Sequence, residues 1–350
     1  MKLSIVIICW NDFKVIQDCL KSIYAQTAPL DFEVIVSDNG STDASIAFIK
    51  EHFPQVRVIE NGANLGYAKG NNAGIRAARG EYVLILNPDT ILHPRSLEKL
   101  VACADQHLEA GAFGCRVLNP DGSDQGPARP LPSVRAYLIS ALYLRSMGRF
   151  FESFASDKYL DWDGRSEREI GFQSGCCVML RRDLLNQLNG FDERFFYHFE
   201  EADLCFRVWK AGRPILFCPD AEITHLGGQS VGRFPIRFAL ETYRSRYRYF
   251  YKHFGEKGLR RIRRVSLLGL SLRWCGYSLM NALKPREALG NRLKCYRTLL
   301  AWNWRLNPLL FIRDGTEPET GYAPLAPAPL MTEGTPPCPE HESNQEHLKI

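Results

Sequence analysis

The 350-residue chain lacks the short motifs that mark several common protein classes. Its 11 cysteines include no Cys-x-x-Cys pair, which excludes zinc-ribbon and thioredoxin-like sites. The adjacent Cys176-Cys177 is expected to pack as two small strand residues, and reduced cysteines fit a cytosolic protein. No Ser-His-Asp arrangement is evident, and the glycine-rich segment 61–74 is neither a dinucleotide nor a P-loop fingerprint.

Long apolar runs are also scarce. The stretch Ile5-Val6-Ile7-Ile8 is too short for a signal peptide and is followed at once by Asn11-Asp12, so we interpret it as a strand. Residues 265–283 approach the length of a membrane span, but Arg273 lies at their centre among polar residues. The sequence therefore predicts no spanning helix.

Strands and helices are predicted to alternate along the first part of the chain. Apolar runs predict strands and apolar residues at helical spacing predict helices. The predicted strands are 3–9, 32–36, 55–60, 82–86, 176–180 and 214–218, and the predicted helices are 12–25, 44–51, 69–79, 137–154 and 200–211, with a loop over 119–132. This order is typical of parallel βαβ units and thus of an α/β fold.

Charge is distributed unevenly. Residues 230–313 contain 19 lysines and arginines against 3 acidic residues, although the whole chain has a formal net charge of only +5. A solvated helical face is one interpretation of this basic segment. Attachment to an anionic membrane surface by amphipathic helices is the other, and we favour it. After Asp314 the chain is rich in Pro, Glu and Thr, which predicts a disordered tail.

Polar side chains follow three of the predicted strands. These are Asn11-Asp12, the segment 37–43, and Asn87-Pro88-Asp89. Each alone is more simply explained by turn and helix-cap chemistry. Because the carboxyl ends of parallel strands meet at one sheet edge, the three together predict a ligand cleft.

The residue types in this cleft suit a nucleotide and a metal. An ionised Asp38 accepts hydrogen bonds, as the N3–H of a uracil or thymine ring requires. Asp89 follows a strand apolar enough to be buried on both faces, and its carboxylate suits a hard divalent cation. In segment 61–74, glycines 66, 70 and 74 permit close helix packing, or the helix start and its amides contact a nucleotide.

Two further candidates lie downstream. Glu200 and Glu201 begin a predicted helix after the aromatic run 195–199, a semi-apolar setting that raises a carboxyl pKa toward that of a useful base. N-terminal charge placement is the simpler alternative. Asp203 and Arg207 are spaced to form an ion pair on this helix. His225 precedes Gly227-Gly228 and suits Mn²⁺ or Mg²⁺ together with an aspartate and phosphate oxygens.

In this order, these segments resemble the family 2 glycosyltransferases, which adopt the GT-A fold, and most closely their bacterial rhamnosyltransferase-like branch. The resemblance covers roughly residues 3–230 and is specific as an ordered set, although each motif is weak alone. It rests on the segments 37–43, 64–72, 86–90, 161–163, 174–175, 190–196, 200–204 and His225 with Gly227-Gly228.

The resemblance implies a role for each candidate residue. Glu201 matches the catalytic base, with Glu200 beside it on the acceptor side. Asp89 matches the second aspartate of an Asp-x-Asp metal motif, whose first position is occupied here by Asn87, and His225 matches a histidine that completes the metal site in some members. Asp38 would bind the nucleotide base. The donor-binding set so implied is Asn11, Asp38, Asn39, Gly66, Asn72, Asn87 and Asp89.

The implied reaction is inverting transfer of a sugar, with dTDP-rhamnose as the first guess for the nucleotide-sugar donor. The acceptor would be a hydroxyl of a glycan or lipid-linked acceptor in cell-surface polysaccharide biosynthesis, and the cofactor a divalent cation, Mg²⁺ or Mn²⁺. The expected catalytic domain is 1–230, with a nucleotide-sugar half 1–118 and an acceptor-side half 119–230. A basic helical extension over 231–313 and a tail over 314–350 follow. The expected location is cytoplasmic, peripheral on the inner face of the plasma membrane.

Two alternatives remain at the level of sequence. A sugar nucleotidyltransferase shares a metal aspartate and a nucleotide cleft, but needs a basic glycine-rich loop that segment 9–12 does not supply. A non-enzymatic nucleic-acid-binding protein would use the basic C-terminal region. The sequence contains no recognised nucleic-acid motif, and the acidic remainder would repel a phosphate backbone.

Overall fold

The computed structural model describes residues 1–26, 29–149, 158–227 and 235–320. It divides into two compact units. Unit 1 comprises Met1–Leu131 and Asp161–Arg233, and unit 2 comprises Pro132–Leu160 and Phe234–Ile350. The expected catalytic domain 1–230 therefore differs from unit 1, because residues 132–160 group with the C-terminal helices.

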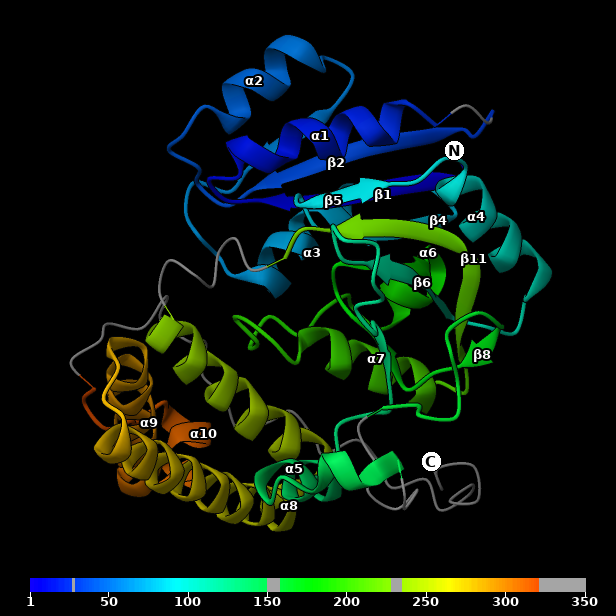
Figure 1. Cartoon of the computed structure of the whole chain (residues 1–350). Coiled ribbons are helices and arrows are strands. Elements are labelled where there is room, and N and C mark those ends of the chain that lie inside the picture. Colours follow the sequence, from blue (N-terminus) through cyan, green and yellow to red (C-terminus); the bar gives the residue numbers. More distant parts are fainter. Residues whose placement is uncertain (27–28, 150–157, 228–234, 321–350) are drawn as a thin grey trace. The chain divides into compact units, whose positions relative to one another are not determined.

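Unit 1 is an α/β unit built around one large sheet (Figure 1). Its strands are β1 (Leu3–Cys9), β2 (Phe32–Asp38), β3 (Arg57–Glu60), β4 (Tyr82–Leu86), β5 (Thr90–Leu92), β6 (Ala112–Leu118), β7 (Ala128–Arg129), β8 (Arg168–Glu169), β9 (Phe172–Gln173), β10 (Cys177–Arg181) and β11 (Ile215–His225). Its helices are α1 (Phe13–Tyr24), α2 (Ser45–His52), α3 (Tyr67–Ala77), α4 (Ser96–Gln106), α6 (Arg182–Gln187) and α7 (Glu200–Lys210).

The main sheet has the strand order β3-β2-β1-β4-β10-β6-β11-β5, with β8 also pairing with β11. Strands β1, β2, β3 and β4 are parallel, and so are β6 and β11, whereas β10 is antiparallel to both of its neighbours. The predicted mostly parallel sheet is confirmed. Since β2, β1 and β4 are adjacent, the three polar strand ends lie along one edge, as expected.

Helices cover both faces of the sheet, with α1 and α2 on one side and α3 and α7 on the other (Figure 1). Leu3, Ile5 and Ile7 of β1 belong to the core cluster that includes apolar residues of α1, α2 and α4. On the opposite face, α3 approaches β1 closely, because a Cβ on Gly74 would lie 2.4 Å from Cγ1 of Val6. For Gly74 this contact supports close helix packing, one of the two interpretations left open for the glycines of this segment.

Three elements between residues 90 and 118 were not predicted: β5, α4 and β6. Gly114 interrupts the apolar pattern of β6, and the structure shows why a glycine is there. A Cβ at this position would lie within 2.3 Å of Oε1 of Gln173, so the strand makes room for a buried amide. Strand β11 also runs seven residues further than the predicted strand 214–218, with an irregularity between Cys218 and Glu222.

The cysteines differ in part from the expectation that all are reduced. Cys103 of α4 and Cys218 of β11 form a disulfide. Cys176 and Cys177 are buried and free, which confirms that this adjacent pair packs rather than bonds. Buried thiols of this kind behave as small apolar side chains.

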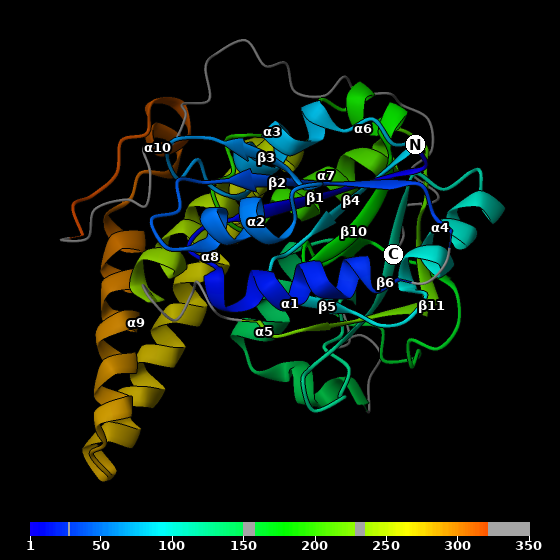
Figure 2. The ribbon, with the colours of Figure 1, turned by 90° about the horizontal axis from the view of Figure 1, so that it is seen from above.

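The secondary structure in the described part of unit 2 is helical: α5 (Val134–Ala141), the 3₁₀ helix η1 (Leu144–Arg149), α8 (Pro235–Leu283), α9 (Glu287–Arg305) and α10 (Pro308–Asp314). The predicted helix 137–154 is thus two shorter elements, and its end lies outside the described residues. Helix α8 is interrupted at Gly255, where φ is 60° and ψ is −162°. In Figure 2, α8 and α9 run side by side, in agreement with their extensive contacts.

The start of the predicted disordered tail is held in place within unit 2. The guanidinium of Arg244 donates to both carboxylate oxygens of Glu317, at 2.8 and 2.9 Å, and also to Glu241 at 2.7 Å. The indole of Trp302 donates to Glu317 as well, at 3.3 Å. The expected disorder therefore does not begin at Asp314, and residues 321–350 lie outside the described part.

Candidate functional site

Asp38 lies at the carboxyl end of β2 and is 4% exposed. Its carboxylate accepts hydrogen bonds from the backbone N–H groups of Gly40 at 3.2 Å and Ser41 at 3.1 Å, so the acid both closes the turn after β2 and faces the sheet edge. Asn11 follows β1 in a left-handed conformation with φ of 56°. Its side-chain oxygen accepts from the N–H of Thr42 at 2.7 Å, which ties the two strand ends together.

Asn39 joins this edge to the start of α3. Its amide donates to the carbonyl of Gly66 at 3.0 Å and accepts from the amide of Asn61 at 3.1 Å. Gly66 adopts φ of +81°, and a Cβ there would lie 2.5 Å from the ring of Phe196. Residue 66 must therefore lack a Cβ for the loop before α7 to pack against α3.

Asn72 of α3 is 4% exposed, and its amide is used inside unit 1. It donates to the carbonyl of Phe191 at 2.8 Å and accepts from the N–H of Phe191 at 2.9 Å. These reciprocal bonds dock the turn 190–193 on α3. The predicted donor-binding residue thus lies in the wall of the site, with its polar atoms directed at the protein.

Asp89 and His225 are brought together by the pairing of β5 with the end of β11, in which His225 lies opposite Thr90. Nε2 of His225 lies 3.2 Å from Oδ1 of Asp89, and both side chains are largely buried. On its other side, Nδ1 of His225 lies 3.0 Å from Oε1 of Gln125. Gln125 donates through Nε2 to the carbonyl of His225 at 2.6 Å, which assigns its Oε1 as the acceptor for the ring.

This hydrogen-bond pattern fits a metal ligand. A proton on Nδ1, donated to Gln125, leaves the Nε2 lone pair of a neutral imidazole directed at the Asp89 carboxylate, and two such donors suit a cation between them. Neighbouring ligands of an octahedral Mg²⁺ are about 3.0 Å apart, close to the observed separation. Among the described residues no group of three or more His, Cys, Asp or Glu side chains could hold a metal. Any ion here would need ligands from the substrate or solvent.

Asn87 begins the same turn as Asp89. Its Oδ1 is buried and has no hydrogen-bond partner among the described residues, while its N–H donates to the carbonyl of Cys176 at 2.9 Å. A buried amide oxygen without a donor is costly. The oxygen is therefore available to a ligand at the strand end.

Glu200 and Glu201 occupy the first turn of α7. The two residues before them, His198 and Phe199, both have positive φ, 63° and 69°, which is strained backbone for side chains of this size. Glu200 is 4% exposed and Glu201 is half-buried. The predicted ion pair on this helix is confirmed, with Nε of Arg207 2.8 Å from Asp203.

Burial raises the pKa of both glutamates above the ordinary value, as the preceding aromatic run predicts. For Glu200 the charges of Glu201 and then Asp203 raise the pKa further. For Glu201 backbone hydrogen bonding and the charge of Arg129 oppose the shift. Oε2 of each glutamate is buried without a hydrogen-bond partner in the described part of the chain. The two acids therefore share one buried site, in which Glu201 is the more accessible.

A short segment before β10 connects the glutamates with the Asn87–Asp89 turn. The hydroxyl of Tyr67 donates to the carbonyl of Gly175 at 2.6 Å, and a Cβ on Gly175 would lie 3.6 Å from Cβ of Glu201. The next residue, Cys176, bonds Asn87. Burial raises the pKa of the Cys176 thiol to about 12, with contributions from the charges of Asp89 and Glu201. Both carboxylates therefore lie near one cysteine.

Sequence reasoning missed four residues that complete this arrangement: Tyr67, Gly175, Gln125 and Tyr197. In the sequence Tyr67 and Gly175 stand out only as parts of larger motifs, and Gln125 lies in the predicted loop 119–132. The phenol of Tyr197 has its pKa raised by burial and then by the charges of Glu200, Glu201 and Asp89. Its position in the aromatic run 195–199 just before the acidic pair was the available signal for Tyr197.

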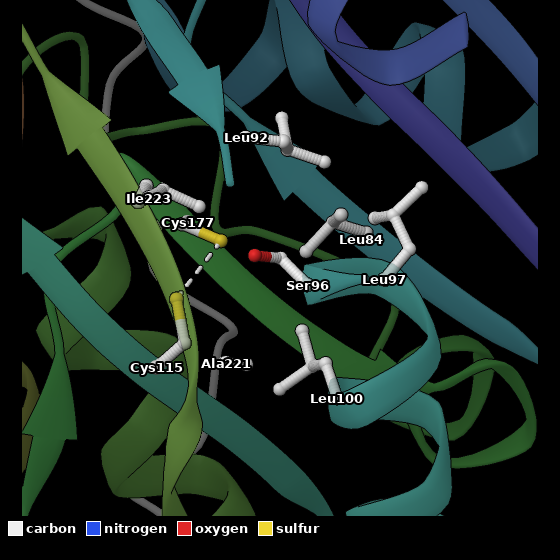
Figure 3. Close-up of a pocket in the computed structure, with 9 residues that line it drawn as sticks. All are labelled: Leu84, Leu92, Ser96, Leu97, Leu100, Cys115, Cys177, Ala221 and Ile223. Carbon is white, nitrogen blue, oxygen red and sulfur yellow. Dashed lines mark hydrogen bonds between the residues drawn. The ribbon is translucent and has the colours of Figure 1, made fainter. Parts of the chain in front are cut away.

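Unit 1 also contains a small apolar cavity (Figure 3). It is lined by Leu84, Leu92, Ser96, Leu97, Leu100, Cys115, Cys177, Ala221 and Ile223. The thiols of Cys115 and Cys177 lie 3.4 Å apart beside it. Because no charged side chain lines it, this cavity is a packing defect and not the candidate site.

Comparison with known proteins supports one family. Residues 4–188 match the model described as Glycosyl transferase family 2. The N-acetylglucosaminyl-diphospho-decaprenol L-rhamnosyltransferase of Mycobacterium tuberculosis is 34% identical over 228 residues, covering 61% of this chain and 73% of that protein. The low-salt glycan biosynthesis hexosyltransferase Agl10 of Haloferax volcanii is 24% identical over 227 residues, covering 64% of this chain and 66% of that protein.

A solved structure shares the architecture. The mannosyltransferase PcManGT of Pyrobaculum calidifontis, in complex with GDP-Man and Mn²⁺, superposes with a TM-score of 0.51 and 16% sequence identity. The match covers 86% of this chain and 85% of that one. At this identity the likeness shows the fold alone, which confirms the expected GT-A architecture.

Proposed function

Since the chain belongs to glycosyl transferase family 2, we propose that it transfers a sugar from a nucleotide-diphospho-sugar to a hydroxyl of a lipid-linked glycan acceptor, with inversion at the anomeric carbon. The relative from M. tuberculosis is named as a rhamnosyltransferase with a polyprenyl-diphosphate-linked acceptor, and it supports dTDP-rhamnose as the first donor to test. Family membership places the chain among glycosyltransferases and not among the nucleotidyltransferases or nucleic-acid-binding proteins considered above.

One observation carries the proposal. Asn87, two residues before Asp89, donates its backbone N–H to Cys176, and the neighbouring Gly175 lies beside Glu201, so a carboxylate suited to a metal and a carboxyl suited to a base both approach one short segment. Sugar transfer needs these two functions on either side of one anomeric carbon. The leaving diphosphate requires neutralisation, and the attacking hydroxyl must lose its proton.

Donor binding is assigned to the sheet edge. Asp38 would accept a hydrogen bond from the nucleotide base, while Asn11 and Asn39 hold the loops on either side of it. The start of α3 lies beside this edge, but the N–H of Gly66 donates to the side chain of Asn64 at 3.0 Å and the N–H of Tyr67 donates to the carbonyl of Phe196 at 2.8 Å, so these two amides are assigned to the fold and not to the phosphates. Asn72 contributes by fixing the turn 190–193 and not by direct contact.

The metal would be held by Asp89 and His225, with the amide oxygen of Asn87 as a further candidate ligand. A divalent cation bound there supplies charge neutralisation of the nucleoside diphosphate as it leaves. Gln125 fixes the ring of His225 so that Nε2, and not Nδ1, is directed at Asp89.

The catalytic step is assigned to Glu201. Its carboxylate takes the proton of the acceptor hydroxyl as that oxygen forms the new bond to the anomeric carbon, and the bond from this carbon to the diphosphate oxygen breaks with the electron pair leaving on the phosphate. Glu200 is more deeply buried, and burial together with the charge of Glu201 raises its pKa. We assign it a supporting role beside Glu201.

The direct test is a donor screen. Purified full-length chain is incubated with a panel of dTDP-, UDP- and GDP-sugars, and hydrolysis or transfer is followed by nucleoside diphosphate release. We expect one thymidine or uridine donor to be preferred. Calorimetric titration with dTDP, UDP and GDP, with and without Mn²⁺, provides the matching affinities. Release from no donor, together with no nucleotide binding, would refute the proposal.

No helix in the described part of the chain has the length and hydropathy that a membrane span requires. We therefore propose that the protein reaches a lipid-linked acceptor from the cytoplasm, attached peripherally to the inner face of the plasma membrane. The basic helices of unit 2 support this attachment.

A further inference from the structure

Helix α8 carries an exposed stripe along one face after its break at Gly255. The stripe recurs at intervals of three or four residues, so it follows a single side of the helix. Its members, here called the α8 outer stripe, are Lys257, Arg261, Arg264, Leu268, Leu272, Cys275, Leu279 and Leu283. All of them are exposed, although five are apolar.

The opposite side of this helix segment is covered by other helices of unit 2. The rings of Tyr277 and Tyr296 of α9 stack with centroids 5.3 Å apart. Arg263 donates to the carbonyl of Leu306 at 2.9 Å, and Arg273 donates to the carbonyl of Ser140 of α5 at 3.3 Å. The stripe is thus the face of this helix segment that α5 and α9 leave uncovered.

The exposure of the apolar members is substantial. Leu279 is 63% exposed and Leu283 is 78% exposed, and Met280 beside them is 53% exposed. Leucines this accessible, aligned on one helix face, form a surface that is unfavourable in water. Single exposed leucines need no explanation, but an aligned set does.

The charges on the α8 outer stripe indicate what kind of surface it binds. Its first part is basic, with Lys257, Arg261 and Arg264 on the same side as the leucines, and the exposed Lys284 and Arg286 follow its far end. An apolar strip with cations at both ends matches a lipid surface, whose acyl region takes the leucines and whose anionic headgroups take the cations. A protein groove complementary to it would have to combine an apolar floor with acidic ends.

We propose that the α8 outer stripe is the membrane-docking face of the protein, and that it lies in the plane of an anionic lipid surface. The leucines insert among the acyl chains, and the three basic residues bind headgroup phosphates. The proposal deepens the peripheral attachment proposed above by naming the face, and it rests on that attachment but not on the identity of the sugar donor.

The experiment uses full-length protein and sedimentation of sucrose-loaded vesicles of phosphatidylcholine, with and without phosphatidylglycerol. The wild type should bind only the anionic vesicles and release them as salt rises. The variant Arg261→Gln/Arg264→Gln should bind about 30-fold more weakly, at about 1 kcal/mol for each cation. The control variant Lys14→Gln/Lys99→Gln removes two exposed charges elsewhere and should bind as the wild type does.

The apolar part is tested with Leu268→Gln/Leu279→Gln/Leu283→Gln, which should bind at least about tenfold more weakly. The control Leu108→Gln, at a residue 67% exposed in unit 1, should leave binding unchanged. A polarity-sensitive dye on the exposed Cys275, with Cys295 and Cys338 replaced by serine, should shift to the blue on anionic vesicles.

The proposal is overturned if the wild type ignores anionic vesicles, or if the leucine variant binds them normally. It is also overturned if sedimentation velocity shows a wild-type dimer that the leucine variant converts to monomer without any vesicle binding, because the stripe then serves a second copy of the chain. Nucleotide binding is measured on the same samples. Its loss with normal vesicle binding would count against the proposed reaction alone.

Discussion

Nε2 of His225 lies 3.2 Å from Oδ1 of Asp89, although 136 positions separate the two residues in the chain. The contact depends on β5, a strand of only three residues that pairs with the end of β11. Two donors held this close and largely out of water are poised for a cation.

The first prediction concerns this metal site. Replacing Gln125 by leucine removes the acceptor that fixes the His225 ring and should weaken Mn²⁺ binding about 10- to 100-fold in the presence of nucleoside diphosphate. Electron paramagnetic resonance of free Mn²⁺ measures the affinity. The variant His107→Ala changes another part-buried histidine, whose ring lies 3.2 Å from Glu109 after α4, and should leave the affinity unchanged. Equal Mn²⁺ affinities in Gln125→Leu and the wild type would show that His225 is not a ligand of the metal.

The second prediction separates the two glutamates. Glu201→Gln keeps the shape of the side chain but removes the base, so kcat should fall about 100- to 10,000-fold while donor affinity stays near that of the wild type. Glu200→Gln should retain much more activity, because the proton transfer is assigned to Glu201 and not to Glu200. Turnover and calorimetric titration with the donor distinguish these effects. A larger loss of kcat in Glu200→Gln than in Glu201→Gln would make Glu200 the catalytic base.

The third prediction is the acidic limb of the pH–rate profile. Glu201 must be ionised to accept a proton, and burial raises its pKa above the ordinary value of 4.5. The rate should therefore still be rising with pH above 4.5, and the midpoint of the rise should lie above that value. Steady-state rates across a constant-ionic-strength buffer series give the midpoint. A limb at or below the ordinary value would contradict the buried setting.

The fourth prediction concerns stability. The folded-state pKa of Glu200 is raised, so the folded chain binds more protons than the unfolded chain above pH 4.5, and stability falls as pH rises through the raised pKa. Glu200→Gln removes this loss. Its Tm should exceed that of the wild type at neutral pH, by about 2–4 °C for each kcal/mol gained in the free energy of unfolding. The difference in Tm should shrink toward acidic pH. Thermal unfolding followed by tryptophan fluorescence measures it.

The fifth prediction compares two glycines that both have positive φ. At Gly66 an added Cβ would lie 2.5 Å from Phe196, whereas at Gly62 nothing lies within 4 Å of it. Gly66→Ala should therefore cost about 1–3 kcal/mol more than Gly62→Ala, since only the former adds overpacking to backbone strain. Chemical denaturation of the two variants gives the difference. Equal costs would show that the loop carrying Phe196 yields without penalty.

Sequence patterns were sufficient where a segment's own residues determine its structure. The runs of Val and Ile in β1, β2 and β4 predicted buried parallel strands, and the aromatic run before Glu200 predicted its raised pKa. They were insufficient where the determinant lies far away in the chain. The glycine of β6 serves Gln173, and the three-residue β5 exists because β11 pairs with it. No local pattern contains such information.

The residues of the candidate site also fall into those that the sequence predicts and those that depend on distant contacts. Asp38, Asp89 and Glu201 stand out because an acid at a strand end or a helix start is visible in the sequence. Asn72 carries an equally suggestive side chain, yet its amide bonds Phe191, 119 positions away. Tyr67 and Gly175 were not predicted, because they matter through the hydrogen bond between them and not through a residue type that stands out in the sequence.

Strand β10 belongs to the segment 119–230, which we expect to serve the acceptor, yet it lies between β4 and β6 of the segment 1–118, which we expect to bind the nucleotide-sugar. The two halves therefore cannot be exchanged as modules between relatives, nor can 1–118 be excised as a nucleotide-binding fragment. Without β10 such a fragment would expose unpaired edges on both β4 and β6. Changes of donor and of acceptor preference must accordingly evolve on a single shared sheet, with each limiting the other.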